Sequence, residues 1–178
     1  MNLLKNNFVG LISVLMLVGC SNAIDSDSQA EKLAKTTIEQ ASVVTNEIKQ
    51  FAGLNDEQKS CVEKIDFSPI ESKVKTILEK ALTGEELKKI NEFNASEPAQ
   101  AFINYRREQT IIATGGTVDK PSPKPSEQQM KQVLEFRESD LGSKYAEVYE
   151  SEEQGGLALA MENFLTQELT KCHVEMTK

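Results

Sequence analysis

Apolar residues recur every three or four positions along most of the chain, which is the spacing of one face of an α-helix. One such pattern occurs twice, because segment 82–103 matches segment 125–146 when the sequence is shifted by 43 positions without a gap. The matched apolar pairs are Leu87 with Met130, Ile90 with Val133, Phe93 with Phe136, and Phe102 with Tyr145. This internal similarity predicts a duplicated helix–break–helix unit.

Each copy also contains residues that are typical of helix starts. Segments Thr83–Glu86 and Ser126–Gln129 both have the spacing of a capping box, in which a hydroxyl and a Glu or Gln side chain bind each other's backbone N–H groups. Ser96 and Ser139 are each followed by an acid, so we expect them to cap a second helix in their copy.

Further helices are predicted outside the two copies. Amphipathic patterns cover residues 30–51 and 157–172, and a short helix is expected from Asn55. Another helix should begin with Ser68 as its N-cap, because a Pro and a Glu follow at the favoured positions. A loop at 113–125, with three prolines, separates the copies. The sequence therefore predicts an all-α domain, a small bundle of about seven to nine short helices.

The first copy contains the pattern Leu-x-x-Ile-x-x-Phe-x-x-Ser-x-Pro-Ala from Leu87 to Ala99, and the second copy echoes it. The pattern resembles a DUF2059-like family of exported bacterial helical proteins, a domain of unknown function. The resemblance covers the two copies and rests on packing residues. It departs from the family pattern at Asn94 and Arg137, where an aromatic residue is usual. It implies an all-helical fold and no known activity.

The N-terminus carries one positive charge, at Lys5, followed by an apolar run that is too short to span a bilayer comfortably. This segment leads into the tetrapeptide Leu17-Val18-Gly19-Cys20. The tetrapeptide resembles the lipobox of bacterial lipoproteins, in which the Cys is lipidated and becomes the new N-terminus. Cys20 is therefore the expected lipidation site. The alternative is an ordinary signal peptide followed by an unrelated Cys.

Three segments follow from this assignment: a lipoprotein signal peptide (1–19), a flexible tether (20–29) and a helical domain (30–178). Several acyl chains on one Cys attach a protein to a membrane without spanning it. The residue after the Cys is Ser21 rather than Asp, which by analogy with enterobacterial sorting favours the outer membrane, facing the periplasm.

The chain is acidic, with a formal net charge of −8. Removal of the signal peptide removes Lys5 and makes the mature chain more negative. Such a surface is repelled by nucleic acid and by anionic lipid headgroups, so we expect no nucleic-acid partner. The expected partners are the membrane, through the lipid, and an envelope protein of unknown identity. Acidity also simply keeps a domain soluble.

Cys61 and Cys172 are the two cysteines that remain beside Cys20. Disulfides persist in exported proteins, so an even pair predicts a Cys61–Cys172 bridge. Free or separately paired thiols are the alternative. The neighbouring His173 is the only histidine, which leaves a zinc site short of ligands and makes a catalytic Cys–His contact unfavourable, because adjacent helical residues point apart. We expect no metal, no other cofactor and no catalytic residue.

These observations favour a non-catalytic protein-interaction or adaptor module. A first alternative is binding of a small apolar ligand in a pocket between Phe93, Phe102, Phe136 and Tyr145. A second is an immunity-type inhibitor of a basic envelope toxin, which fits the charge and the compartment. A hydrolase that uses the carboxylates at positions 92 and 135, which recur in the two copies, ranks lowest.

Overall fold

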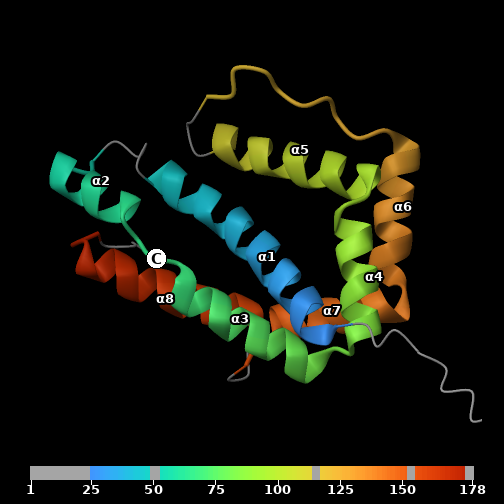
Figure 1. Ribbon diagram of the computed structural model, residues 1–178. Coiled ribbons are helices and arrows are strands. Elements are labelled where there is room, and N and C mark those ends of the chain that lie inside the picture. Colours follow the sequence, from blue (N-terminus) through green and yellow to red (C-terminus); the bar gives the residue numbers. More distant parts are fainter. Residues whose placement is uncertain (1–24, 49–52, 114–116, 152–154, 175–178) are drawn as a thin grey trace, which may run out of the picture.

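The computed structural model describes residues 25–48, 53–113, 117–151 and 155–174 of the 178-residue chain. This part of the chain contains eight α-helices and no strand (Figure 1). In chain order they are α1 (Ser26–Ile48), α2 (Asp56–Glu63), α3 (Ser68–Ala81), α4 (Gly84–Asn94), α5 (Glu97–Ala113), α6 (Glu127–Glu138), α7 (Asp140–Glu150) and α8 (Leu157–Lys171). The predicted all-α fold is confirmed. The predicted signal peptide (1–19) and Cys20 lie outside the described residues.

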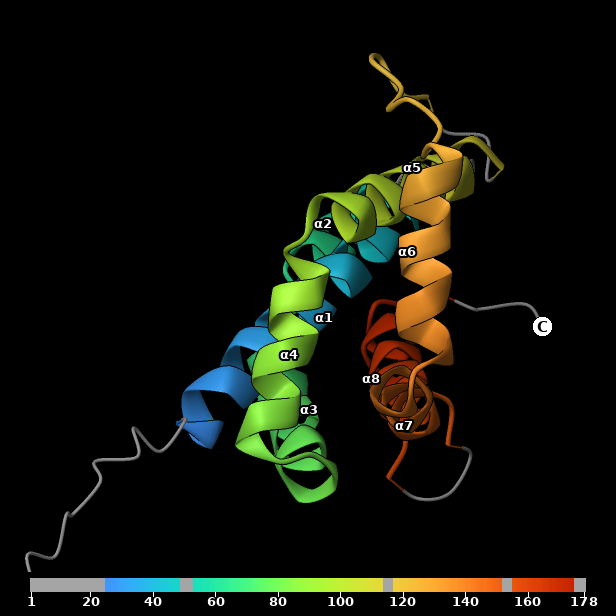
Figure 2. The same ribbon diagram turned by 90° about the vertical axis from the view of Figure 1, so that its right-hand side faces the viewer.

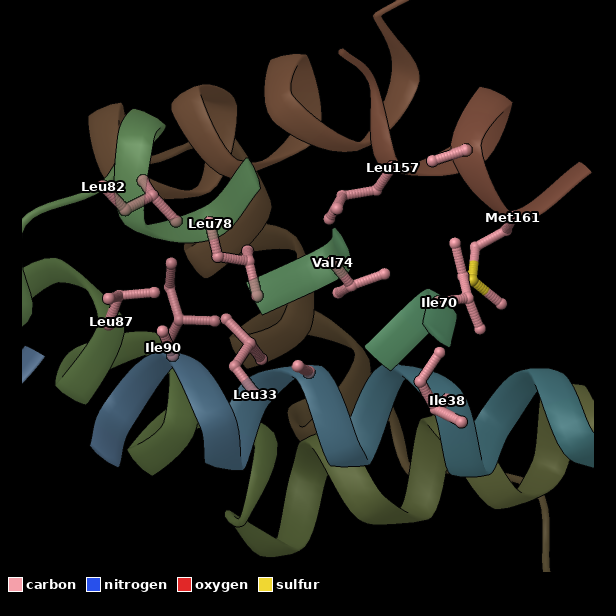
Figure 3. Close-up of a cluster of buried hydrophobic side chains, with 13 residues drawn as sticks. Leu33, Ile38, Ile70, Val74, Leu78, Leu82, Leu87, Ile90, Leu157 and Met161 are labelled. Carbon is pink, nitrogen blue, oxygen red and sulfur yellow. The ribbon is translucent and has the colours of Figure 1, made fainter. Parts of the chain in front are cut away.

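The main hydrophobic core lies where α1, α3, α4 and α8 meet (Figure 3). α1 packs against α3 and α4, and α3 packs against α8. Within this core, the side chains with no exposed area are Ala30, Leu33, Ala34, Val74, Leu78, Leu87, Ile90 and Leu157. Burial of one large aliphatic side chain contributes roughly 1.5–3 kcal/mol to folding, so these four helices form the stable body of the domain.

Helix α1 begins at Ser26, within the segment that the sequence predicted to be a flexible tether. Its first turns are held in the body. Asp27 forms an ion pair with Lys75 of α3, and Asn91 Nδ2 of α4 donates to Gln29 O (2.9 Å) and to Gln29 Oε1 (3.0 Å). The apolar spacing located the helix but not its start, because the first turn is fixed by polar contacts.

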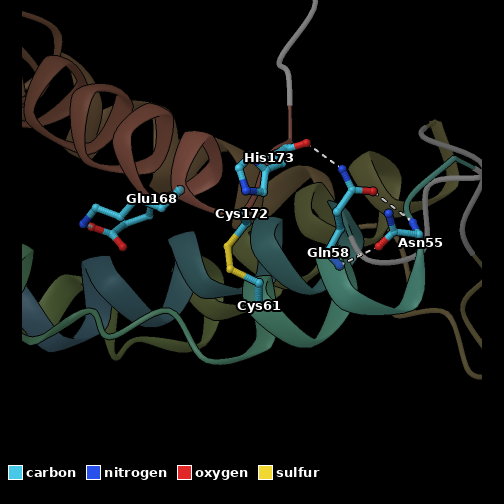
Figure 4. Close-up of a disulfide and its surroundings, with 7 residues drawn as sticks. Asn55, Gln58, Cys61, Glu168, Cys172 and His173 are labelled. Atoms are coloured by element: carbon cyan, nitrogen blue, oxygen red, sulfur yellow. Dashed lines mark hydrogen bonds and ion pairs between the residues drawn. A yellow bond between two sulfur atoms is a disulfide. The ribbon is translucent and has the colours of Figure 1, made fainter.

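The end of the body opposite the start of α1 is closed by a disulfide between Cys61, in α2, and Cys172, directly after α8 (Figure 4). The two Cα atoms are 5.5 Å apart, and the residues are separated by 111 positions. Val62 and Leu169 are buried beside the bridge and form a second small core. The predicted pairing of these two cysteines is therefore the one that the structure contains.

Local capping decides where most helices begin. Asn55, Thr83 and Ser126 each accept a hydrogen bond from the backbone N–H three residues later, and each forms the full capping box. Ser68 is different, and its prediction as an N-cap is wrong. It lies inside α3, the N-cap is Phe67, and the Asp66 carboxylate accepts from the Ser68 backbone N–H (2.9 Å) and hydroxyl (2.7 Å).

The two repeat copies are the pairs α4–α5 and α6–α7, each with a break at the predicted serine. Ser139 is the only residue between α6 and α7, and its hydroxyl accepts from Gly142 N (3.1 Å). Ser96 accepts from Ala99 N (3.5 Å) in the same way. The second break is tighter, because a Cβ at position 142 would lie 1.9 Å from Phe136 O, and only a glycine fits there.

Candidate interaction surface

The two repeat copies meet through equivalent residues. Phe93 of α4 and Phe136 of α6 stack with their ring centroids 3.7 Å apart and their planes 7° from parallel. Figure 2 shows α4 and α6 side by side, with α5 crossing above them. Equivalent residues of the two copies are therefore in direct contact.

The capping-box residue of each copy also reaches the second helix of the other copy. Lys144 Nζ of α7 donates to Glu86 Oε1 (2.7 Å) and Oε2 (2.9 Å) of α4. At the equivalent position in α6, Gln129 Nε2 donates to Glu97 Oε1 of α5 (3.1 Å). The Lys144 ammonium and the Thr83 backbone N–H lower the pKa of Glu86 to about 2. These contacts hold the copies in one fixed arrangement.

The pocket predicted between the four aromatic residues is partly filled. Phe93 and Phe136 are in direct contact, so no ligand fits between their rings. Phe136 and Tyr145 pack against the main core, and burial raises the pKa of the Tyr145 phenol. Phe102 is half-buried in α5 and is not part of either core cluster.

A groove of about 920 Å³ lies elsewhere, between α3, the end of α7 and the start of α8. Its walls combine apolar residues such as Ile77 and Val148 with the charged residues Lys73, Lys80 and Glu147. None of the four residues of the predicted pocket lines it. The sequence did not reveal this groove, since it forms between helices that are distant in the chain.

The Cys172–His173 pair has a structural explanation at the end of α8. His173 adopts a left-handed conformation, with φ of 53°. His173 N donates to Thr170 O (3.0 Å), and Val174 N donates to Leu169 O (2.9 Å), which together make a Schellman cap. Gln58 Nε2 also donates to His173 O (2.5 Å; Figure 4). His173 therefore shapes the chain beside the disulfide.

The recurring carboxylates form equivalent surface ion pairs rather than a shared site. Glu92 lies 3.8 Å from Lys88, and Glu135 lies 3.6 Å from Lys131. All four side chains are well exposed, which is the usual situation for helical pairs of small energetic value. Within the described ranges, no group of three or more His, Cys, Asp or Glu side chains is placed to hold a metal ion.

Helices α5 and α6 and the segment 117–125 between them form an arm that is poorly buried. Ala99 and Glu108 are the buried residues of α5, and α6 has none. The Glu108 carboxylate accepts from the Ser122 backbone N–H and hydroxyl (both 2.6 Å), which fastens the segment to α5. These hydrogen bonds lower the pKa of Glu108. The arm is thus ordered although few of its residues are buried.

Large apolar side chains are exposed on this arm. Ile112 of α5 is 49% exposed and Leu134 of α6 is 46% exposed. Neither residue belongs to the core clusters of the described part of the chain. Neither residue belongs to the repeat pattern from which the sequence predicts the fold, although Leu134 directly follows Val133 of that pattern.

No family model, curated protein or solved structure matches the chain. Among the helices that the structure describes, none is long and apolar enough to cross a membrane.

Proposed function

We propose that the protein is a lipid-anchored lipoprotein of the bacterial cell envelope that serves as a non-catalytic interaction module for another envelope protein. The sequence Leu17-Val18-Gly19-Cys20 supports lipidation of Cys20. Ser21 supports placement in the outer membrane, facing the periplasm. The pattern Leu87–Ala99 supports membership of the DUF2059-like family as part of the same proposal.

The observation that carries the interaction role is the exposed apolar surface of the arm. Ile112 and Leu134 each expose almost half of their surface on helices that are held in place by hydrogen bonds and ring stacking. The buried centres of protein–protein interfaces are more apolar than the rest of a protein surface, so these two side chains support a binding role. The acidic net charge favours a partner with a basic rim.

Metabolic labelling with an alkyne fatty acid tests the anchor. The wild-type chain should incorporate the label and sediment with the membrane fraction, whereas Cys20→Ala should do neither. Cys61→Ala serves as the matched control, because it also removes a cysteine but should leave labelling unchanged. Labelling of Cys20→Ala at the wild-type level would exclude lipidation at this residue.

Photo-crosslinking in intact cells tests the interaction surface. A benzophenone amino acid at Ile112 or Leu134 should give a reproducible adduct with one envelope protein. Tyr149 of α7 is the matched control, because it is 44% exposed but lies outside the arm. Absence of adducts at both arm positions, or the same adducts at all three, would contradict the proposal.

A further inference from the structure

The groove between α3, the end of α7 and the start of α8 has an apolar lining that is continuous with the main core. Its apolar residues are Ile77, Ala81, Val148, Leu159 and Ala160. Ile77, Ala81 and Val148 also pack against the buried residues of the core, and each keeps part of its surface exposed. The volume of about 920 Å³ is that of a small-molecule site, for which roughly 300–1,000 Å³ is usual. A ligand with an apolar part would therefore cover an edge of the core that the described helices leave exposed.

Two lysines on one face of α3 border this groove. Lys73 and Lys80 are seven residues apart, so they lie about two helical turns apart on the same face, with Ile77 between them. Two turns advance a helix by about 10 Å, and a lysine side chain is long and flexible. Both ammonium groups can therefore reach one anion above Ile77, while their aliphatic stems add to the apolar lining.

These two lysines lack the acidic neighbours that other helical lysines of the chain have. Lys35, Lys89 and Lys131 each form an ion pair with a Glu four residues away. The residues three or four positions from Lys73 and Lys80 within α3 and its end are Pro69, Ile70, Thr76, Ile77, Thr83 and Gly84. In the described part of the chain, neither lysine forms an ion pair. Although acidic residues outnumber basic ones in the chain, the partner for these two cations would therefore be an external anion.

One carboxylate in the groove limits the kind of anion that fits. Glu147, near the end of α7, also lines the groove and is exposed. Its negative charge would repel a ligand that carries several anionic groups along its length, as an acidic peptide does. A ligand with a single anionic end can place that end at the lysines of α3 and the rest of its length on the apolar lining. The charges and the lining together thus select one apolar chain with one anionic head.

We propose that this groove binds a single-chain amphiphile with an anionic head, the chemistry that fatty acids and anionic lysophospholipids share. The head lies between the ammonium groups of Lys73 and Lys80. The chain lies along Ile77, Val148 and Leu159. This binding activity goes beyond the proposed interaction role and depends neither on that role nor on lipidation of the N-terminus. It also uses a different site from the pocket that the sequence predicted between the four aromatic residues.

Fluorescence titration with cis-parinaric acid, a fluorescent fatty acid, tests binding directly. The protein is the full chain with Cys20→Ala, so that no acyl chain on Cys20 competes. Saturable binding is expected. The bound probe is then displaced with four amphiphiles of equal chain length, each below its micellar concentration: laurate, lauroyl-lysophosphatidylglycerol, monolauroylglycerol and dodecyltrimethylammonium. At least one of the two anions should act at a concentration lower by about tenfold or more than the cation does, and the stronger anion identifies the head as a carboxylate or a phosphate.

Two double variants separate the groove from the overall charge. Lys73→Gln with Lys80→Gln should weaken binding of the stronger anion by about three- to tenfold and leave binding of the uncharged monolauroylglycerol unchanged, which also shows that the variant is folded. Lys59→Gln with Lys64→Gln is the matched control, because these lysines are equally exposed but do not line the groove. It should leave both affinities unchanged. Equal weakening by the two double variants would overturn the proposal.

Photolabelling locates the bound chain. Laurate with a diazirine in its chain is bound to the same protein and irradiated, and the adducts are mapped by mass spectrometry of a digest. The adducts should lie in segments 73–81, 147–148 and 159–160, which line the groove. Adducts confined to the arm, equal displacement of the probe by the anionic and cationic amphiphiles, or the absence of saturable binding would each overturn the proposal.

Discussion

Gly142 of α7 lies directly against the carbonyl group of Phe136, the residue that stacks on Phe93 at the junction of the two repeat copies. A Cβ at position 142 would come 1.9 Å from the Phe136 oxygen. The first copy has Ala99 at the equivalent position, because two residues rather than one separate its helices. The tight second break therefore depends on the absence of a side chain.

Gly142→Ala should accordingly destabilise the protein by about 1–3 kcal/mol, since the added methyl group can be accommodated only by moving α6 away from α7. Urea unfolding followed by circular dichroism measures the change. Gly155→Ala is the control, because a Cβ there meets nothing within 4 Å. Equal stability of the wild type and Gly142→Ala would show that the break is looser than the structure indicates.

His173→Gly should stabilise the protein by about 1 kcal/mol. His173 has a left-handed backbone conformation, which is sterically unfavourable for a residue with a Cβ. Glycine adopts this conformation without that steric penalty. His173→Ala keeps the Cβ, so it should not stabilise. Thermal unfolding of the three proteins with the disulfide intact tests this. A stabilisation by alanine equal to that by glycine would refute the backbone explanation.

Loss of the Cys61–Cys172 bridge should lower the free energy of unfolding by about 2–5 kcal/mol, because the bridge closes a long loop in the unfolded chain. The double variant Cys61→Ala, Cys172→Ala measures this in denaturant. Dithiothreitol should destabilise the wild type and leave the double variant unchanged. Two free thiols in the non-reduced native wild type would contradict the pairing.

The Glu86–Lys144 ion pair should make stability depend on pH in acid. The pKa of Glu86 falls from 4.5 to about 2 on folding, so its contribution is complete above pH 4.5 and is lost as the pH decreases towards 2. Glu86→Gln removes the charge but keeps the capping-box chemistry that Gln129 already provides in the second copy. It should flatten the pH dependence of stability in that window.

Lys89→Gln is the matched control for this experiment, because it breaks an exposed pair with Glu85 within α4. It should leave the pH dependence unchanged. A pH profile of Glu86→Gln that overlays the wild type would show that the contact between the copies contributes nothing in solution.

Features fixed by a few neighbouring residues could be predicted from the sequence. The capping boxes at Thr83 and Ser126 follow from two side chains and the local backbone, and the structure contains both. Ser68 shows the limit of that reasoning. Its hydroxyl donates to Asp66, a competing acceptor two residues earlier, and the N-cap is Phe67, one residue before the expected one.

Features that depend on which helices meet could not be predicted. Periodicity places Leu87 and Met130 at equivalent positions of their helices, but it does not show that Leu87 becomes fully buried while Met130 stays half-buried. The left-handed conformation of His173 likewise follows from the Schellman cap and the path of the chain after α8, and not from a residue type that usually adopts it.

The contacts of the first turns of α1 limit how far the domain can lie from a membrane to which Cys20 is attached. Gln29 accepts a hydrogen bond from Asn91, and Ala30 is fully buried. Unwinding the start of α1 to lengthen the segment before it would therefore expose the core. With the proposed lipid on Cys20, only Ser21–Asp25 connect the lipidated residue to α1, and this segment spans no more than about 20 Å when fully extended. With the proposed anchor, the domain would therefore bind only a partner that comes close to the same bilayer.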